Sequence, residues 1–67
     1  MKKFIKITDT NNHEHYLNVD YILKFHPLNE KYNGNTMIFL GGGEKVVTIQ
    51  TSTTCEEIID MIELTNN

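Results

Sequence analysis

The segment from Thr53 to Ile62 constrains the fold of this chain more than any other, because it joins a helix-start signal to a single apolar face. Thr53 or Thr54 can accept a hydrogen bond from a backbone N–H of the first turn, and a glutamate three residues later, Glu56 or Glu57, can reach back to the cap. The negative first turn also suits the helix dipole. The segment therefore predicts a helix over residues 54–64.

The apolar residues of this helix recur at the spacing of one buried face. The predicted stripe follows the i, i+3, i+4, i+7 pattern and consists of Cys55, Ile58, Ile59 and Ile62. Two further residues, Met61 and Leu64, flank the stripe and widen it beyond what a solvated helix needs. We therefore expect part of this face to contact a neighbouring chain.

The residues before the helix show the patterns of strands and turns. Alternation with a period of two predicts strands over residues 3–8 and 13–19, and a β-rich composition predicts a third strand over 21–26. The residues from Asp9 to Asn12 predict the first turn, because Asn and Asp tolerate positive φ and hydrogen-bond their own backbone. The first two strands should therefore form a hairpin.

A second hairpin is predicted near the middle of the chain. Residues 36–40 are apolar on both sides, which is typical of a central strand covered by the core on one face and by a helix or another subunit on the other. The three glycines from Gly41 to Gly43 predict a turn that is free to adopt left-handed conformations, and residues 46–50 predict the return strand. The longest predicted loop runs from Pro27 to Asn35.

These elements define an α+β fold in a single domain of residues 1–67. It should contain about five antiparallel strands in a bent, partly barrel-like sheet, with one C-terminal helix packed on it. A domain of 67 residues buries only about 60% of the surface of its unfolded chain, so small domains usually need a disulfide, a metal or a partner. The single cysteine, Cys55, rules out an internal disulfide, and a homo-oligomer is the leading expectation.

The start of the chain predicts a cytoplasmic protein. The basic residues that follow Met1 resemble the start of a secretory signal, but Lys6 and Asp9 interrupt the apolar run at once. No stretch approaches the roughly 20 apolar residues that cross a bilayer, so we expect no membrane insertion.

The charge balance disfavours a nucleic-acid partner. Six lysines, no arginine and nine acidic residues give a formal net charge of −3. Phosphate and guanine recognition depends on clustered basic residues, and above all on arginine. Nucleic-acid binding remains the alternative function, and it would require one shared face for Lys2, Lys3, Lys6, Lys24, Lys31 and Lys45.

Three features resemble chemical sites, and for each a structural role is the preferred interpretation. His13 and His15 form an H-x-H pair, but a zinc site normally needs three or four ligands. Cys55 lies in the first helical turn, where a thiol can be activated, yet it also belongs to the apolar stripe. The glycines at 41–43 connect two strands, unlike a phosphate loop. An enzyme would need the histidines, including His26, or Cys55 to meet an acid in one pocket, so we predict no catalytic residues, no metal and no cofactor.

The aromatic and long apolar residues supply the candidate interface. Phe25 and Phe39 are expected in the core, while tyrosines with amphipathic rings favour an interface border. The candidate interface set is Tyr16, Tyr21, Tyr32, Met37, Phe39, Met61 and Leu64.

The order of short motifs resembles a known family. Residues 5–8 and a polar turn lead to residues 16–20, with an isoleucine beyond; then come Thr36-x-Ile38, a glycine turn, paired valines, and Thr54-x-x-Glu57-Ile58. This order resembles the FlbD/SwrD family of small bacterial proteins linked to flagella and swarming. It departs from that family at Asn11-Asn12, in the loop from residue 27 to 35, and in lacking a charged tail after the helix. The strand-strand-helix ending is also similar to the DNA-binding LytTR domain, without its basic residues.

Together these observations predict a non-enzymatic protein-protein interaction module. The resemblance implies a small bacterial cytosolic protein with a motility role. We expect it to self-associate and to dock on another protein through an edge strand, or through the helix edge near Met61 and Leu64.

Overall fold

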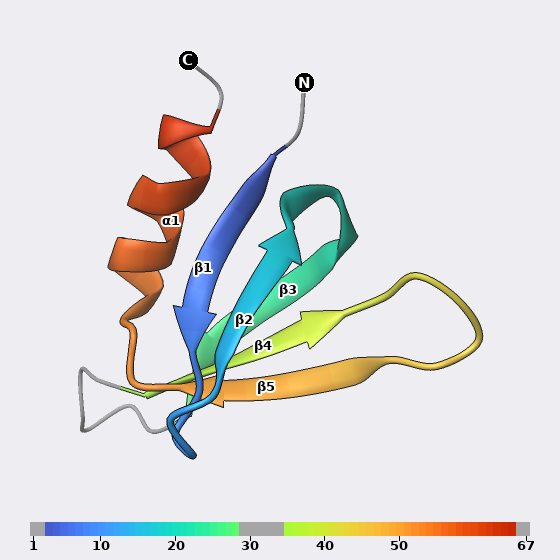
Figure 1. Cartoon of the computed structure of the whole chain (residues 1–67), viewed down its shortest axis with the longest axis horizontal. Coiled ribbons are helices and arrows are strands. Elements are labelled where there is room, and N and C mark those ends of the chain that lie inside the picture. The colour runs from blue at the N-terminus through green and yellow to red at the C-terminus, as the bar shows by residue number, and fades with distance from the viewer. Residues whose placement is uncertain (1–2, 29–34, 66–67) are drawn as a thin grey trace.

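The computed structural model describes residues 3–28 and 35–65. The elements are β1 (Phe4–Thr8), β2 (Glu14–Asn18), the short 3-10 helix η1 (Val19–Tyr21), β3 (Ile22–Pro27), β4 (Thr36–Leu40), β5 (Val47–Thr51) and α1 (Cys55–Leu64). Figure 1 shows α1 on one side of the strands and the β4–β5 hairpin projecting from the other. The prediction of an α+β fold with five antiparallel strands and a C-terminal helix is confirmed.

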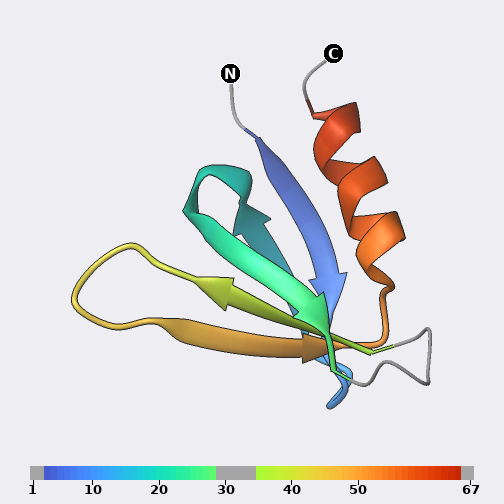
Figure 2. The same ribbon diagram turned by 180° about the vertical axis from the view of Figure 1, so that it is seen from behind.

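The strands form two sheets, so the prediction of a partly barrel-like sheet is wrong. β1 pairs with β2 in a two-stranded sheet, and the order β3-β4-β5 makes the second sheet. The chain passes from β2 to β3 through η1, where the Asn18 side chain accepts a hydrogen bond from the Asp20 N–H. The two sheets meet at one end, through an isolated bridge between Asp9 and Thr51. In Figure 2 the β4–β5 hairpin diverges from β1 and β2 away from that end, and the strands do not close into a barrel.

The core lies between the sheets and the helix. Its buried strand residues lie on the inward faces of the strands, as the period of two requires, and α1 adds one more; the set is Ile5, Ile7, Leu17, Ile38, Ile49 and, from α1, Ile58. Phe25 packs against this cluster, as predicted. Phe39 lies on the other face of β4, next to the ring of His26 at a centroid distance of 5.5 Å, so its prediction as a core residue is wrong. β4 is the central strand, as expected.

The helix begins where the capping signal places it. Thr54 is the N-cap, its hydroxyl accepts from the Glu57 N–H at 3.1 Å, and the Glu57 carboxylate accepts from the Thr54 N–H at 3.2 Å. The buried face is centred on Ile58, with Met61 and Ile62 packed beside it. Ile59 was assigned to the stripe, but its side chain is 45% exposed. The buried face of α1 therefore runs through Ile58, Met61 and Ile62, and Ile59 lies at its exposed edge.

Two turns reach their shape by different means. Asn12 adopts a positive φ of 68° in the first hairpin turn, as expected for asparagine. The predicted glycine turn does connect β4 and β5, but none of the described glycines in it uses a positive φ. Gly41 packs closely on Leu23 instead: a Cβ atom there would lie 2.9 Å from Cδ1 of Leu23, so the exposed leucine side chain would have to move. Within the described part of the chain, no helix is long and apolar enough to cross a membrane.

Candidate functional site

A groove lies between β2 and the projecting β4–β5 hairpin. It has a volume of about 880 Å³ and is lined by the first turn and by residues 40–45 and 47–50, with His15 on the opposite wall. The groove lies beyond the Asp9–Thr51 bridge, where the bonds from Thr10 to Gln50 and from Thr51 to Thr8 also tie the two sheets together. Away from that bridge, Val46 and Val47 of the hairpin tip are 59% and 55% exposed.

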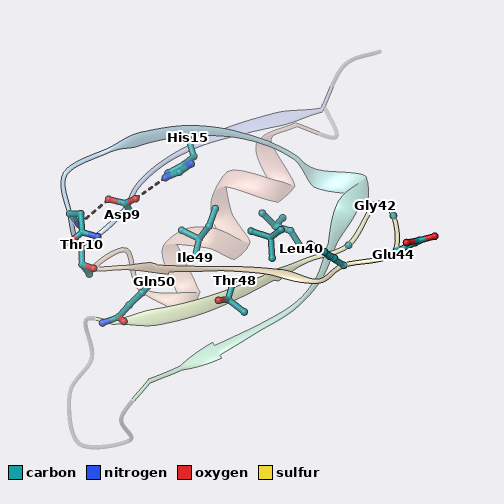
Figure 3. Close-up of a pocket in the computed structure, with 14 residues that line it drawn as sticks. Asp9, Thr10, His15, Leu40, Gly42, Glu44, Thr48, Ile49 and Gln50 are labelled. Atoms are coloured by element: carbon teal, nitrogen blue, oxygen red, sulfur yellow. Dashed lines mark hydrogen bonds and ion pairs between the residues drawn. The ribbon is translucent and has the colours of Figure 1, made fainter.

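The wall that β4 and β5 provide is apolar. Figure 3 shows Ile49 and Leu40 pointing to the side of the ribbon that faces His15, while Thr48 and Gln50 point to the other side. The strand register gives the reason, since Ile38 pairs with Ile49 and Leu40 with Val47 on the same face. Ile49 is buried, but Val47 is 55% exposed. The core face of this hairpin therefore continues past the core into the groove.

The closed end of the groove is held by Asp9. One carboxylate oxygen accepts the backbone N–H groups of Asn11 and His13, each at 2.9 Å, and the other lies 2.8 Å from Nε2 of His15. The hydrogen bond with His15, followed by that with the His13 backbone, holds the pKa of Asp9 below its ordinary value. The neighbouring Thr10 N–H donates to the carbonyl of Gln50 at 3.0 Å. Asp9 thus fixes the turn that ties the first hairpin to β5.

β5 presents one edge to the groove. It is the outer strand of its sheet, so its other edge is the one that pairs with β4. The bond from Thr10 shows that the Gln50 carbonyl points away from β4. Backbone groups of alternate residues point to the same edge of a strand, so the N–H and C=O of Thr48 also face outward. Val46 comes directly before β5, and extending the strand by one residue would turn its backbone groups to the same edge.

The residues considered for catalysis or metal binding come together only in part. His13 and His15 both approach Asp9, with the His13 Nδ1 3.8 Å from the carboxylate. His26 lies on the outer face of β3, beside Phe39. Cys55 is the first residue of α1, and its Sγ lies 3.6 Å from the Thr36 hydroxyl. Across residues 3–28 and 35–65, no three His, Cys, Asp or Glu side chains are grouped to hold a metal. The Asp9–His15 pair is the one close contact among these residues that reaches the groove, and the thiol is not part of it.

The predicted interface residues occupy several separate surfaces. Tyr16 is exposed on the outer face of the first hairpin, and Tyr21 lies beside Gly42 at the hairpin tip. Met37 and Phe39 share the outer face of β4 and are half-buried. The remaining residues are Met61, which packs on the core, Leu64, which is 71% exposed, and Tyr32, which lies outside the described residues.

The helix edge does not form one apolar patch. Ile59 and Leu64 are its exposed large apolar side chains. They are five residues apart, which places them roughly 140° apart around the helix. Met61 lies against the core instead.

The described lysines lie on different elements. Lys6 pairs with Glu14 across the first hairpin at 2.6 Å, and this carboxylate raises the pKa of Lys6. The Nζ of Lys24 lies over the Phe39 ring, 4.7 Å from the ring centroid. Lys45 lies in the β4–β5 connection. Lys2 and Lys31 lie outside the described residues.

The groove itself was not anticipated from the sequence. The strongest sequence signal for the groove was the Val46-Val47 pair. These two β-branched residues have no place in the core, and the strand that follows them is uncharged. Asp9 was interpreted only as a turn residue, and its contact with His15 follows from the hairpin register, which brings residue 15 opposite Ile7.

Comparisons with known proteins give no further assignment. The chain matches no protein-family model, and the searches of curated proteins and of solved structures found no match.

Proposed function

We propose that this protein is a non-enzymatic interaction module that holds an extended segment of protein chain along β5. The observation that carries the proposal is an open strand edge beside an apolar groove. An added strand would hydrogen-bond to the outward backbone groups of Val46 and Thr48 and place its alternate side chains against Leu40 and Val47. This mode needs no reactive group, only an accessible edge and a surface to bury.

The two edges of the three-stranded sheet differ in a way that supports β5 as the docking edge. β3 carries a register shift between Ile22 and Lys24, a histidine and a terminal proline. A bulge, a lysine and a proline are devices by which proteins block unwanted strand pairing. β5 has the sequence VTIQT, with no charge, proline or bulge. The first turn occupies this edge at Gln50 and Thr51, and the part around Thr48 that it leaves open is consistent with an edge that is used.

The Asp9–His15 pair favours a supporting role in this site. Nucleophilic chemistry would need an activated hydroxyl or thiol beside the imidazole and donors for a developing oxyanion. The described groove offers Thr10 and Thr48, and Thr48 points to the other face (Figure 3). The pair therefore serves to fix the closed end of the groove, and a role in motility stays a prediction that depends on the family resemblance.

Selection from a library of random peptides, read out by backbone amide NMR, tests the proposal. We expect the selected peptides to shift the amide signals of Val46 and Thr48 and to lose binding in Thr48→Pro. This substitution removes an N–H that faces outward, so the ladder with β4 stays intact. The matched control is Tyr16→Lys on the first hairpin, which should bind normally. Peptides that bind Thr48→Pro as well as the wild type would overturn the proposal.

A basic surface for nucleic acid would give the opposite pattern. Retardation of an oligonucleotide at low salt that is lost in Lys24→Gln, with no effect of Thr48→Pro, would favour the alternative function.

A further inference from the structure

We propose that the segment held by β5 is the β5 edge of a second copy, paired antiparallel about a two-fold axis that passes beside Val47. This inference rests on the proposed function and names its partner. An antiparallel edge can pair with itself, because the same backbone groups face each other after a two-fold rotation. The hairpin tip projects from the body, so two copies can approach side by side (Figure 1).

The backbone selects one register. The Gln50 carbonyl is already bonded to Thr10, so pairing that uses Gln50 would have to break this contact. The next outward-facing residues are Thr48 and Val46. If each Val46 pairs with Thr48 of the second copy, two hydrogen-bonded pairs form and Val47 faces its own symmetry equivalent. This central pair is the closely spaced, non-hydrogen-bonded type, with Cα atoms about 4.5 Å apart.

The register covers the apolar surface that the monomer leaves exposed. Val46 is 59% exposed and Val47 55% exposed. In the dimer the two Val47 side chains contact each other at the mouth of the groove. A directly opposed pair of β-branched residues is a favourable cross-strand contact. Dimer formation would therefore bury the exposed valines and add to the small apolar area that a domain of this size buries on its own.

Charge complementarity also favours a second copy as the occupant. When the strand extends through Lys45, this residue lies opposite Ile49 of the second copy, on the groove face. Ile49 is two residues from Thr51, which is bridged to Asp9. The long Lys45 side chain therefore points toward the ionised Asp9 of the other molecule, and symmetry gives two such pairs. β5 itself carries no charge, and Glu44, beside Lys45, comes opposite the uncharged Gln50.

Disulfide trapping tests the register. In a Cys55→Ser background, Val47→Cys should form a cross-linked dimer when oxidised glutathione is added, because its Cα separation suits a disulfide. Thr48→Cys is the matched control one residue away. In this register the two residues 48 are offset by two positions, and their Cα atoms lie more than about 7 Å apart, too far to bridge. Cross-linking of Thr48→Cys in place of Val47→Cys would overturn the register.

Sedimentation of the full chain tests the dimer itself. The wild type should dimerise at micromolar concentration, and Val47→Lys and Thr48→Pro should raise the dissociation constant at least about tenfold, with unchanged circular dichroism. Lys45→Gln should raise it less, and high salt should remove the difference from wild type. A wild type that stays monomeric at millimolar concentration would overturn the inference. If such a monomer still binds library peptides at Val46 and Thr48, the proposed function stands; if it does not, both fail.

Discussion

The two ends of the β4–β5 hairpin have similar residues and opposite environments. At the base, Thr36 pairs with Thr51 and Ile38 with Ile49, and all four are buried. At the tip, Leu40 is half-buried while Val46 and Val47 are exposed. The residue types alone do not separate the two ends. What separates them is the first hairpin and helix, which cover the base and stop short of the tip.

The comparison assigns stability to the base and binding to the tip. The buried hydroxyls show the difference most clearly. Thr51 donates to the Thr8 carbonyl at 2.7 Å, and Thr36 donates to the Thr53 carbonyl at 2.7 Å. Each bond joins the sheet to another segment, so the base is specified by directional contacts as well as packing. The tip has an open edge and an uncovered apolar face.

The largest effect is expected at the centre of the base. Ile38→Ala should lower the free energy of unfolding by about 2–5 kcal/mol, because Ile38 is fully buried and the smaller side chain leaves a cavity. Val47→Ala at the tip is the matched control, and in the monomer it should stay within about 0.5 kcal/mol of wild type. Urea unfolding at a concentration below dimerisation measures both. Equal losses for the two variants would remove the distinction between base and tip.

The sequence was informative where a pattern depends only on neighbouring residues. The capping pair Thr54 and Glu57, the alternation of Ile5 and Ile7, and the positive φ of the Asn-rich turn all depend on local geometry. Ile59 was misplaced because the spacing of the helix fits two overlapping stripes, and only the position of the sheet selects the one through Met61.

The arrangement of the two sheets and the groove depended on long-range contacts. A pattern of alternating residues does not state which strands pair beyond a hairpin. The sequence predicts a partly closed sheet, whereas the described strands form two sheets, connected by η1 and by the bridge at Thr51. The groove follows from that separation, so the Val46-Val47 pair could indicate an exposed apolar surface but not the wall opposite it.

An intermediate effect is expected from one buried hydroxyl. Thr51→Val keeps the size and shape of the side chain but leaves the Thr8 carbonyl without its donor. The expected cost is about 1–3 kcal/mol of unfolding free energy. Thr48→Val on the same strand is the matched control, because Thr48 is exposed, and it should change stability by less than about 0.5 kcal/mol. A stable Thr51→Val variant would show that packing alone defines the base.

The smallest effect is expected from acid, through the residue that joins the base to the first turn. The hydrogen bond with His15 lowers the pKa of Asp9 in the folded state. A carboxyl with a lowered folded-state pKa stabilises the fold above its unfolded pKa, and this contribution is lost as the pH falls through the folded value. The difference in unfolding free energy between wild type and Asp9→Asn should therefore shrink between about pH 5 and pH 2.

A carboxyl titration by NMR separates the cause of this acid dependence. In His15→Leu the first and largest partner of Asp9 is gone, so the pKa of Asp9 should move back toward its ordinary value, while the backbone bonds from His13 and Asn11 keep part of the shift. An unchanged Asp9 titration in His15→Leu would mean that the turn alone holds the carboxylate. In that case the His15 side chain would be available to a ligand in the groove. The closed end would then take part in binding, as the tip does, although it lies at the base of the β4–β5 hairpin.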